Sequence, residues 1–152
     1  RRKGYPVQLL GGDIVRNVVD NQDFTPDGRG RHLMYMGLFA RLLNEQGIIA
    51  VCTFVSPLES IRHKLRAAIA DFHLIHIKCS LEEAMRRDVK GLYRRGTHGI
   101  DLFEAPEAAE LTVDTEAYEV AASLDRLTAY LDSLLGAKIG LEKVDSVLSQ
   151  TV

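Results

Sequence analysis

Residues 48–57 read IIAVCTFVSP, and this stretch decides the fold class of the 152-residue chain. Ile48–Val55 is a continuous apolar run rich in β-formers, which predicts a central strand buried on both faces of a parallel sheet. Three other short apolar runs predict strands at Val7–Leu10, Leu74–Lys78 and Leu111–Val113. Between the strands, apolar residues recur every three or four positions and predict helices at Gly30–Gln46, Leu58–Ala70, Leu81–Arg87 and Ala117–Leu135.

The alternation of strands and helices predicts an α/β fold with three layers, in which helices cover both faces of a parallel sheet. Two helix boundaries carry their own signals, since Gly47 is suited to a C-cap and Ser80 to an N-cap. Ligands of such sheets bind beyond the carboxyl ends of the strands. Candidate functional residues are therefore expected directly after each strand.

Composition and charge argue against several classes of function. The net charge of −2 gives no electrostatic footprint for duplex nucleic acid, and no apolar run is long enough to cross a bilayer. Cys52 and Cys79 both lie in apolar runs, which predicts two reduced thiols in a cytoplasmic protein. His73 and His76 have no cysteine or carboxylate partner at metal-ligand spacing, so these histidines predict no zinc site.

Charged residues collect after the predicted strands: Asp13 and Arg16 after the first, then Arg29, then Arg62, then the segment RRDVKGLYRRG at 86–96. Several arginines at one sheet edge predict an anionic substrate, because guanidinium groups bind phosphate or sulfate bidentately. An aspartate among them is typical of metal binding or base catalysis in phosphoryl transfer. For any single residue, a solvated loop charge remains the alternative.

The phosphate-binding motif G-x-x-x-x-G-K-[ST] does not occur in this sequence. Gly91 and Gly96 have its glycine spacing, but Thr97 stands in the lysine position. The opening stretch 1–4 reads as the last turn of a helix with its glycine cap. We therefore expect a preceding strand, a phosphate loop and most of a first helix to be absent from this chain. We also expect these 152 residues alone to turn over ATP poorly.

Motifs in a consistent order resemble those of adenylylsulfate kinase (APS kinase), a P-loop kinase family. They are LLGGDIVRN at 9–17, DFTPDGR at 23–29, IIAVCTFVSPLESIR at 48–62, RRDVKGLYRR at 86–95 and GIDLFEAPEAAELTVDT at 99–115. The resemblance implies a P-loop-kinase-type sheet and the use of ATP and Mg²⁺. It also implies the reaction, phosphorylation of the ribose 3′-hydroxyl of adenosine 5′-phosphosulfate (APS) to give 3′-phosphoadenosine 5′-phosphosulfate (PAPS) for sulfate assimilation.

The resemblance further implies roles for single residues. Asp13 would act in catalysis and contact the Mg²⁺ shell, and Ser56 matches an active-site serine. The implied substrate-binding residues are Arg16, Phe24, Arg29, His32, Ser56, Pro57, Arg62, Lys90, Leu92 and Ile100. A lid would include Tyr93, Arg94 and Arg95, and ATP would contact Arg87 and Pro106. For Phe24, a core aromatic is the alternative.

The chain departs from the family pattern at several positions. Gly11 replaces the first of two acids, His32 replaces an asparagine, and Glu59 replaces the first arginine after Ser-Pro. The segment 95–99 is shorter than in the family and lacks an expected aromatic residue. Two alternatives therefore stay open: a kinase of another anionic nucleotide or sugar, and a non-catalytic nucleotide-binding or regulatory domain.

The predicted organisation is simple. Residues 1–135 form an N-terminally incomplete APS-kinase-like domain, and residues 136–152 form a tail that is a short helix or a linker. We expect a cytoplasmic protein without nucleic-acid or membrane partners. The resemblance implies a homodimer and allows a fused or associated sulfurylase.

Overall fold

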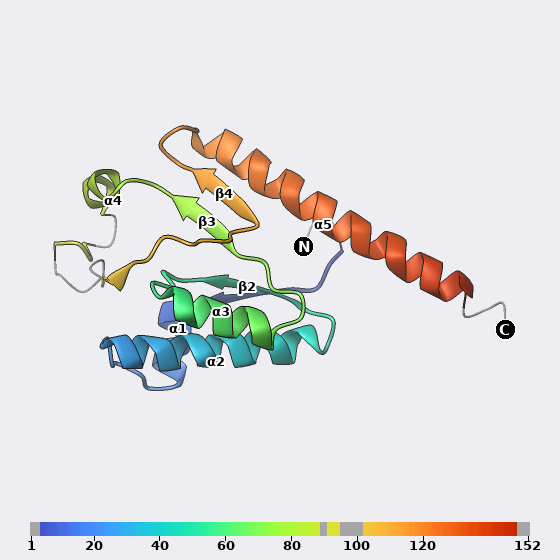
Figure 1. Cartoon of the computed structure of the whole chain (residues 1–152), viewed down its shortest axis with the longest axis horizontal. Helices are drawn as coiled ribbons and strands as arrows, with labels where there is room; N and C mark the ends of the chain where they lie inside the picture. The colour runs from blue at the N-terminus through green and yellow to red at the C-terminus, as the bar shows by residue number, and fades with distance from the viewer. Residues whose placement is uncertain (1–3, 89–90, 95–101, 149–152) are drawn as a thin grey trace. The chain divides into compact units, whose positions relative to one another are not determined.

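The computed structural model describes residues 4–88, 91–94 and 102–148, with side chains described up to residue 136. The chain divides into two compact units, whose elements are labelled in Figure 1. The first unit contains Arg1–His73 and Asp88–Glu107, and the second contains Leu74–Arg87 and Ala108–Val152. Each unit has its own pair of parallel strands.

Two parallel strands form the base of the first unit. β1 (Val7–Gly11) pairs with β2 (Ile49–Thr53) in a register that places Gly11 opposite Thr53. α1 (Gly12–Val18) follows β1 without an intervening loop. Both strands therefore end at the same edge, and α1 begins there.

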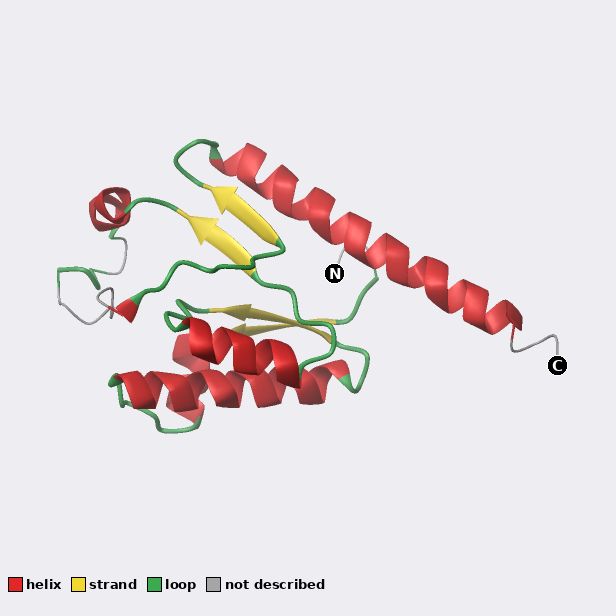
Figure 2. Cartoon of the chain, viewed as in Figure 1, coloured by secondary structure: helices red, strands yellow, loops and turns green. Residues whose placement is uncertain are grey.

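Two helices supply most of the core of the first unit. α2 (Pro26–Asn44) packs on β2 and on α3 (Glu59–Ala68), and Figure 2 shows the two helices side by side. The approach is close at Gly37, where a Cβ would lie 2.3 Å from Leu65 Cδ2. The buried apolar side chains contributed by this region are Leu33, Met36, Ala40, Leu65 and Ile69.

The second unit has the same strand–helix alternation. β3 (Ile75–Lys78) pairs in parallel with β4 (Leu111–Asp114), α4 (Leu81–Arg87) follows β3, and α5 (Val120–Leu148) packs on β4. Val113 on β4 is 1 % exposed. The predicted N-cap of α4 is confirmed, since Ser80 Oγ accepts a hydrogen bond from the Glu83 amide at 3.2 Å.

One helix was not predicted, and three helices start elsewhere than predicted, since α3 begins at Glu59, α5 at Val120 and α2 well before Gly30. α1 was not predicted, because a seven-residue helix is too short to show a periodic pattern. α2 begins at Pro26 and not at Gly30, because Thr25 caps it. The Thr25 hydroxyl accepts from the Gly28 amide at 3.1 Å, and Pro26 is well suited to the first helical turn.

Two further expectations are corrected. Val51 on β2 is 42 % exposed, so this strand is not buried on both faces in the described residues. The parallel pairing is confirmed within each unit, as the β1–β2 and β3–β4 pairs. α5 does not end at Leu135, because it continues through Gly136 to Leu148. A glycine costs a helix only about 1 kcal/mol and is tolerated there. Among the described residues, no helix is long and apolar enough to cross a membrane.

Candidate active site

The candidate site lies where β1 and β2 end in the first unit. Because α1 follows β1 directly, Asp13 lies in the first helical turn, where a carboxylate interacts favourably with the helix dipole. Gly12 allows this abrupt transition, since a Cβ there would lie only 3.3 Å from Phe54 Cβ. Asp13 is exposed. Its carboxylate is therefore accessible to a ligand at the carboxyl edge of the strands.

Two arginines converge on the ring of Phe24. The guanidinium carbon of Arg16 lies 4.4 Å from the ring centroid, and that of Arg29 lies 5.4 Å from it. Arg29 Nε also donates to the Phe24 carbonyl oxygen at 2.9 Å. Phe24 remains 47 % exposed, so the alternative of a core aromatic is wrong. The fold thus brings together three residues that the sequence placed in substrate binding.

Arg16 belongs both to the site and to the loop that follows it. The side chain is 8 % exposed, and its Nη1 donates to the carbonyl oxygens of Asn21 at 3.0 Å and Asp23 at 3.2 Å. Burial lowers the pKa of Arg16 and Arg29 lowers it further, whereas Asp13 and Asp23 raise it. The guanidinium stays charged because its ordinary pKa is very high. Positive charge is therefore held next to Asp13 by the loop itself.

Asp23 organises the loop between α1 and α2, which Figure 2 shows as the connection entering α2. Its Oδ1 accepts from the Thr25 amide at 2.9 Å and hydroxyl at 2.6 Å, and its Oδ2 pairs with Arg31 at 2.5 Å. The hydrogen bonds from Thr25 are the main reason that the pKa of Asp23 is lowered. A Cβ at Gly28 would lie 2.2 Å from Asp23 Cγ, so this loop requires glycine there. Asp23 was not among the predicted site residues, although Asp-x-Thr-Pro ahead of a helix is a turn signal.

His32 lies under this edge and is 3 % exposed. Among the described residues, neither ring nitrogen has a hydrogen-bond partner. Burial, followed by the charge of Arg16, lowers the pKa of His32 more than Asp13 and the Gly12 backbone raise it. The ring is therefore neutral at pH 7. Its contact with substrate stays a prediction, because the side chain is covered in this conformation.

Arg62 holds the loop that follows β2. It is 3 % exposed, and its Nη1 donates to the Ser56 carbonyl oxygen. Its Nη2 donates to the Glu104 carbonyl oxygen at 2.7 Å, and its Nε donates to Glu59 Oε2 at 2.6 Å. Ser56 has a φ of 45°, in the left-handed region that is strained for a residue other than glycine. The donors of Arg62 are thus directed to the protein's own oxygens.

The predicted lid is only partly described. Leu92, Tyr93 and Arg94 are within the described residues, whereas Lys90, Arg95 and Ile100 lie outside them. Asp88 is 8 % exposed and accepts from the Tyr93 amide at 3.1 Å and from Arg94 Nε at 3.3 Å. Burial by itself would raise the pKa of Asp88, but these hydrogen bonds lower it. Asp88 therefore orders the start of this segment, a role that sequence analysis passed over.

In the second unit, Arg87 fastens α4 to the turn after β4. Its Nη1 donates to Thr115 Oγ1 at 2.9 Å, its Nη2 donates to the Thr115 carbonyl oxygen at 2.8 Å, and its Nε pairs with Glu83 at 2.6 Å. Hydrogen bonds from Arg86 and Arg87 lower the pKa of Glu83 to about 2. These residues line an open cavity of about 800 Å³. Pro106, the other predicted ATP contact, belongs to the first unit.

Comparison with known proteins identifies the family. Residues 1–114 match the family model described as Adenylylsulphate kinase. This chain belongs to the adenylylsulfate kinase family. It is 37 % identical over 152 residues to a probable adenylyl-sulfate kinase of Aeropyrum pernix, an alignment that covers 91 % of this chain and 81 % of that protein.

Solved structures of the adenylylsulfate kinase family have the same fold. The APS kinase CysC of Mycobacterium tuberculosis, solved in complex with AMPPNP and APS, has a TM-score of 0.68 and 29 % identity, covering 82 % of this chain and 83 % of that one. A hexameric APS kinase from Thiobacillus denitrificans has a TM-score of 0.64 and 25 % identity, covering 86 % of this chain and 23 % of that one. The predicted family and the α/β P-loop fold class are confirmed. The chain belongs to this family of phosphotransferases, whose members phosphorylate a hydroxyl group of APS to give PAPS.

Proposed function

We propose that Asp13, Arg16, Phe24 and Arg29 form the APS-binding edge, where the 3′-hydroxyl of APS receives a phosphoryl group from ATP. The observation that carries this proposal is the convergence of two guanidinium groups on an exposed aromatic ring, next to Asp13. Arginine suits the phosphate and sulfate oxygens of APS, and an exposed ring suits its adenine. APS therefore offers a binding partner to the two arginines and to the ring of Phe24.

Asp13 is the residue that handles the attacking hydroxyl. In the transfer, the 3′-oxygen forms a bond to the γ-phosphorus of ATP, the bond from that phosphorus to the β–γ bridging oxygen breaks, and ADP leaves. The exposed carboxylate of Asp13 accepts the hydroxyl proton. Mg²⁺ fits this site, because it takes carboxylate oxygens and retains several waters, and Asp13 offers oxygens to solvent. Mg²⁺, when bound, supplies positive charge to the transferring phosphate.

The neighbouring loops shape the site. Ser56 and Pro57 follow β2 and are expected to contact the substrate, and Arg62 is a positioning residue that acts through the Ser56 carbonyl oxygen. Leu92, Tyr93 and Arg94 belong to the lid that excludes water during transfer. Residues that remain predictions for substrate or ATP contact are His32, Arg87, Lys90, Arg95, Ile100 and Pro106.

Calorimetric titration with APS tests the binding edge without requiring turnover. Arg29→Ala removes one guanidinium and is expected to weaken APS binding at least about tenfold, the range of a charge-assisted hydrogen bond. Arg41→Ala is the matched control, because Arg41 lies on the same helix and pairs with Glu45 at 2.9 Å. Equal affinities of the two variants for APS would show that Arg29 does not bind APS.

Asp13→Asn separates binding from transfer. This variant keeps the size of the side chain but cannot accept the proton, so APS binding is retained and the rate of PAPS formation falls about 100-fold or more. The rate is measured as ATP-dependent PAPS formation and compared with that of the unmodified protein under the same conditions. Unchanged PAPS formation would assign the proton to another group.

A second candidate function is phosphorylation of another anionic nucleotide or a sugar. The observation that favours it is Glu59, which stands in the position of a family arginine and neutralises Arg62. A panel of acceptors with ADP release as the readout distinguishes the two candidates. Release that depends on APS alone excludes the second candidate.

A cytoplasmic location, a homodimer and a fused or associated sulfurylase are also part of the proposal. The two free cysteines support the first, and the resemblance to the family supports the other two. The 16.9 kDa chain gives a simple test of assembly by light scattering. A mass of twice that value supports the dimer, whereas a hexamer would match the assembly named for the Thiobacillus denitrificans relative.

A further inference from the structure

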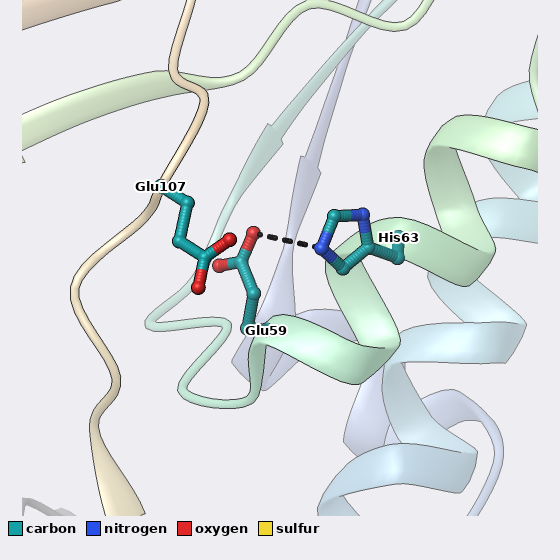
Figure 3. Close-up of side chains that lie close together, drawn as sticks. All are labelled: Glu59, His63 and Glu107. Atoms are coloured by element: carbon teal, nitrogen blue, oxygen red, sulfur yellow. Dashed lines mark ion pairs between the residues drawn. The ribbon is translucent and has the colours of Figure 1, made fainter.

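Three side chains with metal-ligand atoms lie together in the first unit, outside the residues of the proposed APS-binding edge. Glu59, His63 and Glu107 each offer one ligand atom, and these atoms lie within 4.8 Å of one another (Figure 3). Glu59 and His63 are on successive turns of α3, at a spacing of four, so they share one helix face. Glu107 comes from the chain segment that passes this face.

The segment that carries Glu107 is attached to the start of α3. The Glu59 amide donates to the Glu104 carboxylate, and the Glu104 amide donates to the Pro57 carbonyl oxygen at 2.8 Å. Arg62 adds a third hydrogen bond, to the Glu104 carbonyl oxygen at 2.7 Å. The backbone next to Glu107 is therefore ordered before any ligand binds, which reduces the entropy that binding would otherwise cost.

The two oxygens of Glu59 face different partners. Oε2 pairs with Arg62, whereas Oε1 lies 3.4 Å from His63 Nε2. Glu107 brings a second carboxylate to the same point and is exposed. The His63 side chain is 60 % exposed, so an ion can enter from solvent and retain water ligands. The family position of Glu59 is an arginine, which would repel a cation, so this cluster is a departure from the family pattern.

We infer that Glu59, His63 and Glu107 bind one divalent transition-metal ion of the Zn²⁺ class, with water completing the coordination. Ligands at about 2.0–2.2 Å from one ion lie within about 4.2 Å of each other, so the exposed side chains of His63 and Glu107 need to close only slightly on Glu59. A mixed set of imidazole and carboxylates favours such an ion over Mg²⁺, which takes oxygen ligands. The ion ties α3 to the segment that carries Glu107.

Titration of the whole chain with Co²⁺, followed by visible absorption and calorimetry, tests this inference. We expect one ion per chain, no displacement by excess Mg²⁺, and no thiolate charge-transfer band, which excludes Cys52 and Cys79 as ligands. His63→Asn and Glu107→Gln should each weaken Co²⁺ binding at least tenfold. His73→Asn is the matched control and should bind Co²⁺ as the unmodified chain does. Glu59 is left unchanged because it also pairs with Arg62.

Three results would overturn the inference: no saturable Co²⁺ binding, a thiolate band, or unchanged affinity in both His63→Asn and Glu107→Gln. Circular dichroism checks the fold of each variant, and both substituted side chains are exposed. If His63→Asn loses its fold, Glu107→Gln alone decides. The variants change only His63 and Glu107, which lie outside the proposed APS-binding edge, so failure of the metal site leaves the proposed function intact.

Discussion

The arginines of the two units are used in different ways. In the first unit, Arg62 is 3 % exposed and donates to the carbonyl oxygens of Ser56 and Glu104 as well as to Glu59. In the second unit, the Arg86 side chain is 72 % exposed and pairs with the carboxylate of Glu83. The sequence shows the same residue type in both places, after a strand of a parallel pair.

The difference teaches that an arginine-rich strand end is not by itself a ligand site. A buried guanidinium must satisfy its donors within the protein, because each unpaired buried donor costs free energy. An exposed guanidinium exchanges its partner for water at little cost. Arg62 and Arg16 are therefore both held by carbonyl oxygens of the protein, whereas Arg29 lies beside an exposed ring.

Arg62→Ala is expected to have the largest effect on stability. It leaves Glu59 without its buried partner, and the free energy of unfolding should fall by about 3–5 kcal/mol. Urea denaturation measures the change. Arg41→Ala, which removes an exposed pair on α2, should cost at most about 1 kcal/mol. Similar losses in both variants would show that the buried clamp is no stronger than a surface pair.

Gly28→Ala should have the second-largest effect on stability, because it changes the loop between α1 and α2 in the first unit. The new Cβ would lie 2.5 Å from the Asp23 carbonyl oxygen, so the loop must move, at a cost of about 1–3 kcal/mol. Thermal unfolding measures this. Gly136→Ala is the control in the second unit, where nothing lies within 4 Å, and it should raise stability by up to about 1 kcal/mol. A melting temperature unaffected by Gly28→Ala would contradict the close approach.

The pH dependence of stability tests the ion pairs of Glu83 in the second unit. The pKa of Glu83 is lowered from 4.5 to about 2, so its contribution is present above pH 4.5 and is lost as the pH falls towards 2. The urea midpoint should therefore drop less steeply between these pH values in Glu83→Gln than in the unmodified chain. Superimposable curves would mean that Arg86 and Arg87 do not hold this carboxylate in solution.

Arg86→Ala should have the smallest effect. The exposed pair with Glu83 is screened by water and salt, and Arg87 still pairs with the same carboxylate at 2.6 Å. The urea midpoint at neutral pH should stay within experimental error of the unmodified chain. A clear decrease in the urea midpoint would show that Arg86 stabilises the protein as Arg62 does, despite its exposure.

Much of the fold followed from sequence patterns, and the failures have specific causes. The strands and the long helices were found because their side chains repeat with the period of the element. α1 was not predicted because it has only seven residues. The predicted end of α5 was wrong because Gly136 resembles a C-cap glycine, although the helix continues through it. Asp23 and Asp88 were missed because a turn-forming carboxylate resembles any other loop charge.

The sequence by itself determined the alternation of strands and helices, the parallel pairing within each unit and the kinase family. These features depend on residues close together in the chain or on motifs in a fixed order. Only the tertiary structure decided which guanidinium groups donate to the protein's own oxygens, and that Glu107 meets Glu59 and His63. The Arg62–Glu104 hydrogen bond joins residues 42 positions apart, and such contacts depend on how the elements pack and not on local sequence.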